Sequence, residues 1–393
     1  MKQEAHKKLI NAKSGTADAA RLAQKVRFDE FYTPQDDIKN ELNHYKAKFY
    51  GKRIICPCDW DVLKDEDVYS VTIEFAEEPI TPTYILNRVK VVKVKHFEYA
   101  LNLTDEINGP KPVIKEEVVS GDKARELLKT RVTCNFVKYL LGIANECKIK
   151  SITASGYDGI NKRGIKFQDI DYSQYDLCLT NPPFSLYTEF MNCMMTEYEK
   201  RDRVTNPFDF IVLAPLLNRL APNVGVPLFE RKVFLGYNRD THILFRNPDE
   251  HATHDKKKSV DIDWITTFDD AQKEVDKYLI STGIKYDQYK DEYVELTSMT
   301  MKDGTHPIRI NDKRAIPEDY MGWMFCSIGV LNKLSYKYYE WYGSQYTKYF
   351  NTTHPELNPL AHKITPDIFN GAFKGGLFVR RRPDVPYEEP EIS

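Results

Sequence analysis

A four-residue loop, Asn181-Pro182-Pro183-Phe184, carries the clearest chemistry in this chain, and it directly follows the apolar run 175–180. Each proline fixes its own φ near about −65° and restricts the residue before it to extended geometry. The Asn181 amide and the Pro182 carbonyl are therefore expected to point at one spot, with the Phe184 ring beside them. Two acceptors and a ring suit a planar ligand with an exocyclic amino group, such as a nucleobase rotated out of a duplex. The competing interpretation is a proline-rich turn that caps a strand and buries Phe184.

The elements that would position this loop alternate between strands and helices. A helix is expected over residues 35–50, with Thr33 as N-cap, Pro34 at the first helical position and Gly51 at its end. Such alternation predicts an α/β fold with a doubly wound, mostly parallel sheet. The other expected elements are strands at 53–59, 151–157, 175–180, 210–215 and 260–265, a strand end at 166–169, a β-pair of 234–238 with 242–245, and helices at 134–147 and 186–198.

The chain is expected to divide into five parts. Residues 1–27 form a basic arm, and the catalytic domain combines 28–61 with 131–269. Residues 62–130 break the α/β rhythm and are expected to form an inserted β-rich lobe outside the main sheet. Residues 270–382 form a C-terminal accessory region whose aromatic stretch, 323–349, is expected mostly to pack in a core. The acidic, proline-bearing tail, 383–393, is expected to be disordered.

Three loops are expected to meet at one edge of the sheet, because ligands of open α/β sheets bind at the carboxyl ends of the strands. They are Tyr32-Thr33 before the first helix, Cys58-Asp59 after the first strand, and the Asn181 loop. Asp59 could accept hydrogen bonds from a ribose or an ammonium group, or could simply end a strand in a turn. No glycine-rich dinucleotide or triphosphate motif is present.

Composition excludes several classes of protein. The chain has 393 residues, a net charge of −2 and seven cysteines. The pair Cys56 and Cys58 has one intervening residue and no matching second pair, so no metal site is expected and the cysteines are interpreted as reduced core thiols. No apolar stretch reaches the roughly 18 residues of a membrane span, and residues 1–27 lack the apolar core of a secretory signal. A cytoplasmic location is expected.

Clusters of basic residues are candidates for contact with phosphates, despite the slightly negative net charge. The candidates are Lys7, Lys8 and Lys13 in the arm, and Arg380, Arg381 and Arg382 near the C-terminus. The alternatives are a solvated, frayed terminus for the arm and the charged edge of a last strand for the arginines.

The chain resembles the EcoRI-type adenine-specific DNA methyltransferases. Asp29-Glu30-Phe31-Tyr32-Thr33 resembles the cofactor motif of that family, and Cys58-Asp59 at the end of the first strand is similar to its first-strand motif. Thr180-Asn181-Pro182-Pro183-Phe184-Ser185 matches its catalytic motif. The sequence Asp-Trp-Asp at 59–61 departs from the family's Asp-Asp-Pro, and the insert has no counterpart in the pattern.

The resemblance implies a Rossmann-like class I methyltransferase that uses S-adenosylmethionine to methylate the N6 amine of a flipped-out adenine in a specific sequence of double-stranded DNA. It also suggests a cognate restriction endonuclease that acts on the same site. The implied catalytic residues are Asn181, Pro182, Pro183 and Phe184, and the candidate cofactor-binding residues are Phe31, Tyr32, Thr33, Cys58, Asp59 and Asp169.

Two alternatives remain open from the sequence. The same transfer chemistry could act on cytosine N4, on adenine in RNA or on a protein glutamine. A catalytically silent DNA-binding protein could also retain the fold.

Overall fold

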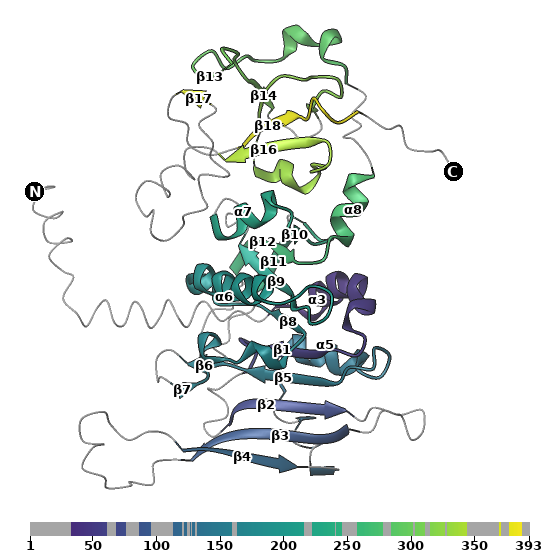
Figure 1. The fold of residues 1–393 in the computed structure, drawn as a ribbon, viewed down its shortest axis with the longest axis vertical. Coiled ribbons are helices and arrows are strands. Elements are labelled where there is room, and N and C mark those ends of the chain that lie inside the picture. The colour runs from purple at the N-terminus through teal and green to yellow at the C-terminus, as the bar shows by residue number, and fades with distance from the viewer. Residues whose placement is uncertain are drawn as a thin grey trace, which may run out of the picture. The chain divides into compact units, whose positions relative to one another are not determined.

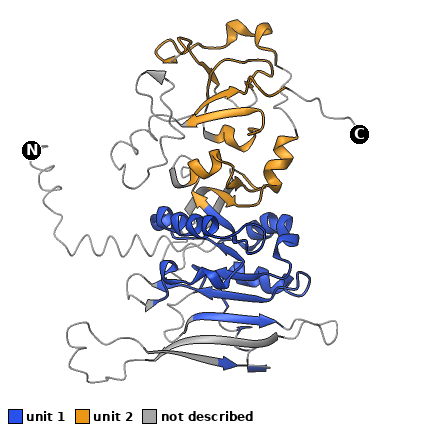
Figure 2. Cartoon of the chain, in the orientation of Figure 1, with its two compact units in different colours: residues 1–213, 243–260 blue, residues 214–242, 261–393 orange. Residues whose placement is uncertain are grey.

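The computed structural model describes about three fifths of the chain, from Thr33 onward, and divides it into two compact units. Unit 1 comprises residues 1–213 and 243–260, and unit 2 comprises 214–242 and 261–393 (Figure 2). The expected catalytic domain ends at 269, whereas 214–242 and 261–269 group with the C-terminal residues. The described residues are 33–60, 68–75, 86–95, 113–119, 122–123, 126, 128–129, 132–158, 163–215, 222–239, 241–245, 258–277, 284–301, 303–310, 315–326, 328–343, 369–370 and 377–386.

Four parallel strands form the centre of unit 1, in the order β9 (Asp209–Pro215), β8 (Leu177–Thr180), β1 (Arg53–Cys56) and β5 (Ser151–Ser155). Their partners are in register, with Ile55 beside both Thr153 and Cys178. Short, nearly continuous apolar runs are typical of strands that are buried on both faces of a parallel sheet. All four strands lie where the sequence predicts them, and the carboxyl ends of β1 and β8 are therefore neighbours.

Helical segments follow the predicted positions with small shifts. Residues 35–50 form α3 (Gln35–Leu42) and then a 3-10 segment, η1 (Asn43–Phe49), and Gly51 ends the segment with φ +65°. The N-cap of α3 is Pro34, one residue beyond the predicted Thr33. Among the described residues, the unit also contains α5 (Asn135–Ile143) and α6 (Tyr187–Lys200).

The strands of the insert extend the main sheet, so the expectation of a lobe outside it is wrong. β2 (Val68–Phe75) pairs antiparallel with β5, and β3 (Leu86–Lys95) and β4 (Val113–Val119) continue in turn (Figure 1). β2 covers the edge of β5, which would otherwise leave its backbone groups unpaired. Val71 and Ile73 are each only 1% exposed, so β2 is anchored by apolar burial as well as by hydrogen bonds. Seven strands of a larger mixed sheet, from β9 to β4, thus lie mainly in unit 1.

A second correction concerns residues 166–169, for which the sequence predicts a strand end. Residues 167–169 instead form the 3-10 segment η2 (Phe167–Asp169), which is followed by η3 (Tyr172–Gln174). The Tyr172 hydroxyl donates to the Phe167 carbonyl over 3.0 Å, which closes this segment on itself. Two short strands, β6 (Tyr157–Asp158) and β7 (Arg163–Gly164), pair with each other before it.

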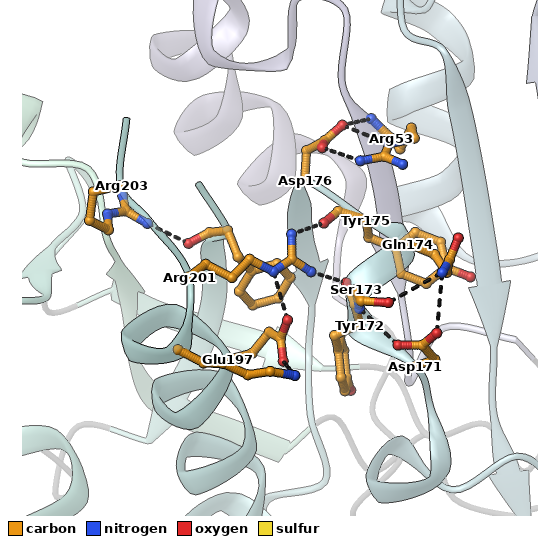
Figure 3. A network of polar contacts seen from close by, with 12 residues as sticks. Arg53, Asp171, Tyr172, Ser173, Gln174, Tyr175, Asp176, Glu197, Arg201 and Arg203 are labelled. Atoms are coloured by element: carbon orange, nitrogen blue, oxygen red, sulfur yellow. Dashed lines mark hydrogen bonds and ion pairs between the residues drawn. The ribbon is translucent and has the colours of Figure 1, made fainter. Parts of the chain in front are cut away.

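An ion-paired network fixes the amino ends of the central strands (Figure 3). Arg53, which begins β1, binds Asp176 just before β8, with Nη2 2.7 Å from Oδ1. Arg203 binds Asp209, the first residue of β9, over 2.5 Å. Arg201 donates to Glu197 over 2.6 Å and to the Tyr175 carbonyl over 2.7 Å, and it also binds the Tyr172 carbonyl. Because these ion pairs fix where the strands begin, they also fix the positions of the strand ends relative to one another at the carboxyl edge of the sheet.

Three strands between residues 234 and 266 pair with one another, and unit 2 contains a four-stranded sheet. β10 (Phe234–Leu235) and β11 (Thr241–Phe245) each pair with β12 (Lys258–Thr266), which corrects the expected pairing of 234–238 with 242–245. The four-stranded sheet has the order β14 (Ile308–Ile310), β15 (Met324–Cys326), β18 (Leu377–Arg381) and β16 (Tyr339–Gly343). The other elements in the described part of this unit are α7 (Pro222–Phe229), α8 (Asp270–Asp276), η6 (Tyr286–Gln288), η7 (Lys290–Glu292), β13 (Thr300–Met301), η9 (Ile328–Asn332) and β17 (Phe369–Asn370).

The aromatic residues of unit 2 form a core, as the sequence predicts for most of them. Trp323 packs with Phe378, Met299 and Met301. Tyr336, Tyr338, Tyr339 and Trp341 are likewise buried. Within the described residues, none of the helices combines the length and apolar character that a membrane crossing requires.

Candidate active site

The loops that follow β1 and β8 meet through one short hydrogen bond. Asp59 lies three residues beyond the end of β1, and Thr180 is the last residue of β8. The Thr180 hydroxyl donates to Asp59 Oδ2 over 2.6 Å. Because β1 and β8 are parallel neighbours, their ends lie at the same edge of the sheet. The Asp59 loop and the Asn181 loop are therefore brought together at the edge where the sequence places a ligand site.

The end of β5 holds the Asp59 loop from the other side. The backbone N–H groups of Asp59 and Trp60 both donate to the Ser155 carbonyl, over 3.0 and 3.1 Å. The next residue, Gly156, passes so close to this loop that a Cβ atom there would lie 2.1 Å from the Trp60 carbonyl oxygen. Glycine is the residue that allows this approach of two backbones.

The start of α5 connects Asp59 with Thr33. The Cys134 thiol, at the N-cap of α5, donates to Asp59 Oδ1 over 3.1 Å. The adjacent Asn135 side chain donates to the Thr33 carbonyl over 2.8 Å. Thr33 is only 4% exposed, and its hydroxyl oxygen is buried with no hydrogen-bond partner among the residues that the structure describes. Two consecutive residues at the start of α5, the N-cap and the first helical residue, thus link the first two of the three predicted loops.

Asp59, which binds both Thr180 and Cys134, has an altered pKa. Burial raises the pKa of Asp59 from 3.8 to about 7, although the hydrogen bonds from Thr180 and Cys134 favour the ionised form. A carboxyl group that titrates near neutral pH, beside a strand-end loop, is a feature that clusters at functional sites.

The Asn181 loop has the stiff geometry that its prolines predict. Pro182 is buried, whereas Asn181, Pro183 and Phe184 are half-buried. Pro183 has φ −58° and ψ 124°, and its carbonyl accepts the Leu186 N–H over 3.0 Å in η4 (Phe184–Leu186), which leads into α6. The side-chain oxygen of Asn181 is shielded from solvent.

Of the other predicted cofactor residues, two lie outside the described residues and two are described. Phe31 and Tyr32 belong to the first group. Cys58 is half-buried beside Asp59, and Asp169 is exposed on η2. Among the described residues, the hydrogen bonds that link Thr33, Asp59 and Thr180 do not extend to Asp169.

Of the predicted DNA-binding residues, the structure describes the three arginines but not the three lysines. Lys7, Lys8 and Lys13 lie outside the described residues. Arg380 is ion-paired with Glu340 over 2.5 Å, and its guanidinium lies 4.3 Å from the centre of the Trp323 ring. The backbone N–H of Arg382 donates to the Tyr338 carbonyl over 2.8 Å, and Arg381 Nη1 lies 3.5 Å from the Glu318 carbonyl oxygen.

Sequence reasoning does not identify four residues that build this site, namely Thr180, Cys134, Asn135 and Gly156. The sequence places Thr180 in the catalytic motif without a role, and it indicates only a core thiol for Cys134. The usable signals are positional, because Cys134 and Asn135 begin a helix and Gly156 follows a buried strand. Those signals do not say which strand end each residue contacts.

Comparisons with known proteins match the parts of the chain that contain Asp59 and the Asn181 loop. A family model described as "Adenine-specific methyltransferase EcoRI" matches residues 19–66 and 170–365, which include Asp59 and the Asn181 loop and omit α5 and most of the insert. The type II methyltransferase M.EcoRI of Escherichia coli is 22% identical over 342 residues, which cover 84% of this chain and 90% of that protein. No solved structure matches the chain.

Proposed function

Since this chain belongs to the EcoRI-type adenine-specific methyltransferase family, we propose that it transfers a methyl group from S-adenosylmethionine to the N6 amine of an adenine in DNA. The target is an adenine within a specific sequence of double-stranded DNA, rotated out of the helix. The observation that carries the proposal is the Asp59–Thr180 hydrogen bond, because it joins the expected cofactor loop to the residue that precedes Asn181.

The residues at the sheet edge fit S-adenosylmethionine. The Asp59 carboxylate suits a ribose hydroxyl or an ammonium group, and the buried Thr33 hydroxyl oxygen offers a further polar atom. Phe31, Tyr32 and Cys58 would complete the binding residues. When bound, S-adenosylmethionine supplies an activated methyl group on a positively charged sulfur.

The Asn181 loop would act on the adenine amine. The lone pair of that nitrogen is delocalised into the ring, which makes the amine a poor nucleophile. Hydrogen bonds from the amine to the Asn181 side-chain oxygen and the Pro182 carbonyl favour a pyramidal nitrogen with an exposed lone pair. Catalysis then depends on positioning and on acceptors placed for developing positive charge, and the proton can leave after transfer.

Phe184 would hold the rotated base by stacking. Base–aromatic stacking contributes about 1–3 kcal/mol. Rotation of a base out of the duplex costs a few kcal/mol, so one such contact offsets much of that cost. Phe184 is half-buried and begins the 3-10 turn before α6, which fixes its backbone.

The proposed partners follow from the proposed reaction. They are double-stranded DNA and, as for a type II methyltransferase, a restriction endonuclease that recognises the same sequence. The proposed location is the cytoplasm.

The decisive experiment compares Asn181→Ala with Asn192→Ala, an exposed asparagine on α6. Single-turnover transfer of tritiated methyl groups to DNA propagated without adenine methylation should fall by about 10²- to 10³-fold for Asn181→Ala, as for the loss of one group that stabilises developing charge. Calorimetry should show nearly unchanged affinity for S-adenosylmethionine.

Asn192→Ala should match the wild type in both measurements. An Asn181→Ala protein that methylates DNA at the wild-type rate would overturn the assigned role. Incorporation of label into RNA or protein rather than DNA by the wild type would overturn the proposed substrate.

A further inference from the structure

Thr180 occupies an unusual position between the two halves of the proposed site. Its hydroxyl donates to Asp59 Oδ2 over 2.6 Å, and its own carbonyl carbon is bonded to the nitrogen of Asn181. The residue is fully buried as the last member of β8, with Val212 of β9 as its backbone partner on one side. The rotamer of Asp59 and the start of the Asn181 loop are therefore fixed by the same residue.

We infer that Thr180 is a positioning residue, whose hydroxyl holds the Asp59 carboxylate for the cofactor while its backbone places Asn181 for the adenine. This inference rests on the proposed methyltransferase function. One hydrogen bond then aligns the methyl donor and the amine, and small errors in such alignment reduce reaction rates strongly.

A second donor to the same carboxylate provides an internal comparison. Cys134 donates to Asp59 Oδ1 over 3.1 Å from the start of α5, and a thiol is a weaker donor than a hydroxyl. Cys134 contacts Asp59 but is not part of β8 or of the Asn181 loop. Loss of either donor should disfavour ionised Asp59, whereas only loss of the Thr180 hydroxyl should also disturb the loop.

Few titratable groups surround this carboxyl group in the part of the chain that the structure describes. They are the thiols of Cys56 at the end of β1, Cys178 in β8, Cys134 at α5 and the nearby Cys58. Burial raises the pKa values of Cys56, Cys134 and Cys178 well above the ordinary value, so these thiols stay neutral near pH 7. Asp59, whose pKa burial raises to about 7, is the group expected to give a protonation midpoint near pH 7 in the free protein.

The test measures S-adenosylmethionine affinity without DNA from pH 5.5 to 9, and single-turnover methylation at saturating S-adenosylmethionine and high pH. The affinity of the wild type should rise through a midpoint near pH 7, because the cationic cofactor prefers ionised Asp59. Thr180→Val should move the midpoint up by about one pH unit, the effect of losing one hydrogen bond to a carboxylate. It should also slow methylation at least about tenfold, as expected for a misplaced reacting group.

Three further variants separate positioning from a structural effect. Thr180→Ser should restore both the midpoint and the rate. Cys134→Ala should raise the midpoint but slow methylation less than Thr180→Val does. Thr196→Val removes a hydroxyl that binds a backbone carbonyl on α6 and should match the wild type. Thr180→Ala replaces Thr180→Val if the valine variant does not fold.

The results distinguish this inference from the proposed function. An active wild type with a Thr180→Val variant of equal rate, or equal loss of rate in Cys134→Ala, would overturn the positioning role alone. If the wild type does not methylate adenine, the proposed function is wrong. The hydrogen-bond role can still be tested in that case, because the S-adenosylmethionine titration needs no DNA. A Thr180→Val midpoint equal to that of the wild type would then refute that role as well.

Discussion

At the scale of the residue, Asp59 combines a position in the candidate site with a cost to stability. Its pKa is about 7 in the folded protein, against an ordinary value of 3.8, chiefly because of burial. Between these two values the unfolded chain is ionised while the folded protein holds the proton. The contribution of Asp59 therefore becomes less favourable to folding as pH rises from about 4 to 7, and the full penalty is present above pH 7.

Replacement of Asp59 by asparagine should remove this penalty. We expect Asp59→Asn to be more stable than the wild type at pH 8, by at most about 4 kcal/mol, and to show little gain at pH 4. Melting temperatures from pH 4 to 8 measure the difference, with the exposed Asp287→Asn as a control that should follow the wild type at every pH. A constant difference between Asp59→Asn and the wild type across this range would show that Asp59 is not the group that titrates. The variant should at the same time bind S-adenosylmethionine weakly.

The site residues are predictable to different extents. The Asn181 loop and Asp59 can be located from sequence because prolines and a strand-end carboxylate have direct local signatures. The roles of Cys134 and Asn135 cannot, because they depend on where the start of α5 lies relative to loop residues 75 and 102 positions earlier in the chain. Tertiary placement of this kind has no local periodicity to detect.

At the scale of the element, the Arg201 network is the feature most open to test. The Arg201 side chain is only 4% exposed, and it binds Glu197, whose side chain is 12% exposed, together with two backbone carbonyls ahead of β8. Removal of a buried ion-pair partner leaves the remaining charge without compensation and costs about 3–5 kcal/mol.

Arg201→Met should therefore lower the free energy of unfolding by about 3–5 kcal/mol in urea titrations. Lys200→Met is the matched control, since Lys200 is 68% exposed in its side chain and lies 3.7 Å from the same Glu197. Its effect should stay within about 0.5 kcal/mol. Equal effects of the two substitutions would contradict the role assigned to the buried arginine.

Sequence patterns predict where the strands of this protein lie but not how all of them pair. β1, β8 and β9 are apolar runs bounded by polar or proline residues, so each strand can be predicted. The β-rich nature of the insert is equally clear, but its pairing is not, because alternation along β2 does not specify which edge it joins. The 3-10 segment at 167–169 escapes prediction because three residues are too few to show a helical period.

At the scale of the whole molecule, a net charge of −2 means that DNA affinity must come from local clusters of cations. The sequence places Lys7, Lys8 and Lys13 in such a cluster. Arg380 differs from them, because its guanidinium is already held by Glu340 and Trp323. We therefore expect the three lysines to contribute more to phosphate binding than Arg380 does.

The triple variant with glutamine at Lys7, Lys8 and Lys13 should bind DNA less tightly and with a weaker salt dependence. The slope of log affinity against log salt should decrease in magnitude by about one for each DNA phosphate that the variant no longer neutralises. Fluorescence anisotropy at several salt concentrations measures it, with glutamine at the exposed Lys200, Lys273 and Lys277 as the control. An unchanged slope in the arm variant would remove the arm from the DNA interface.

The close approach of Gly156 to Trp60 also constrains how this sequence can diverge. Even a methyl group at position 156 would overlap the Trp60 carbonyl oxygen, so the end of β5 and the chain that leaves β1 are sterically interlocked. A relative with a larger residue at this position must have a rerouted or longer connection after its first strand. The two segments, about one hundred residues apart, should therefore change together over evolutionary time or not at all.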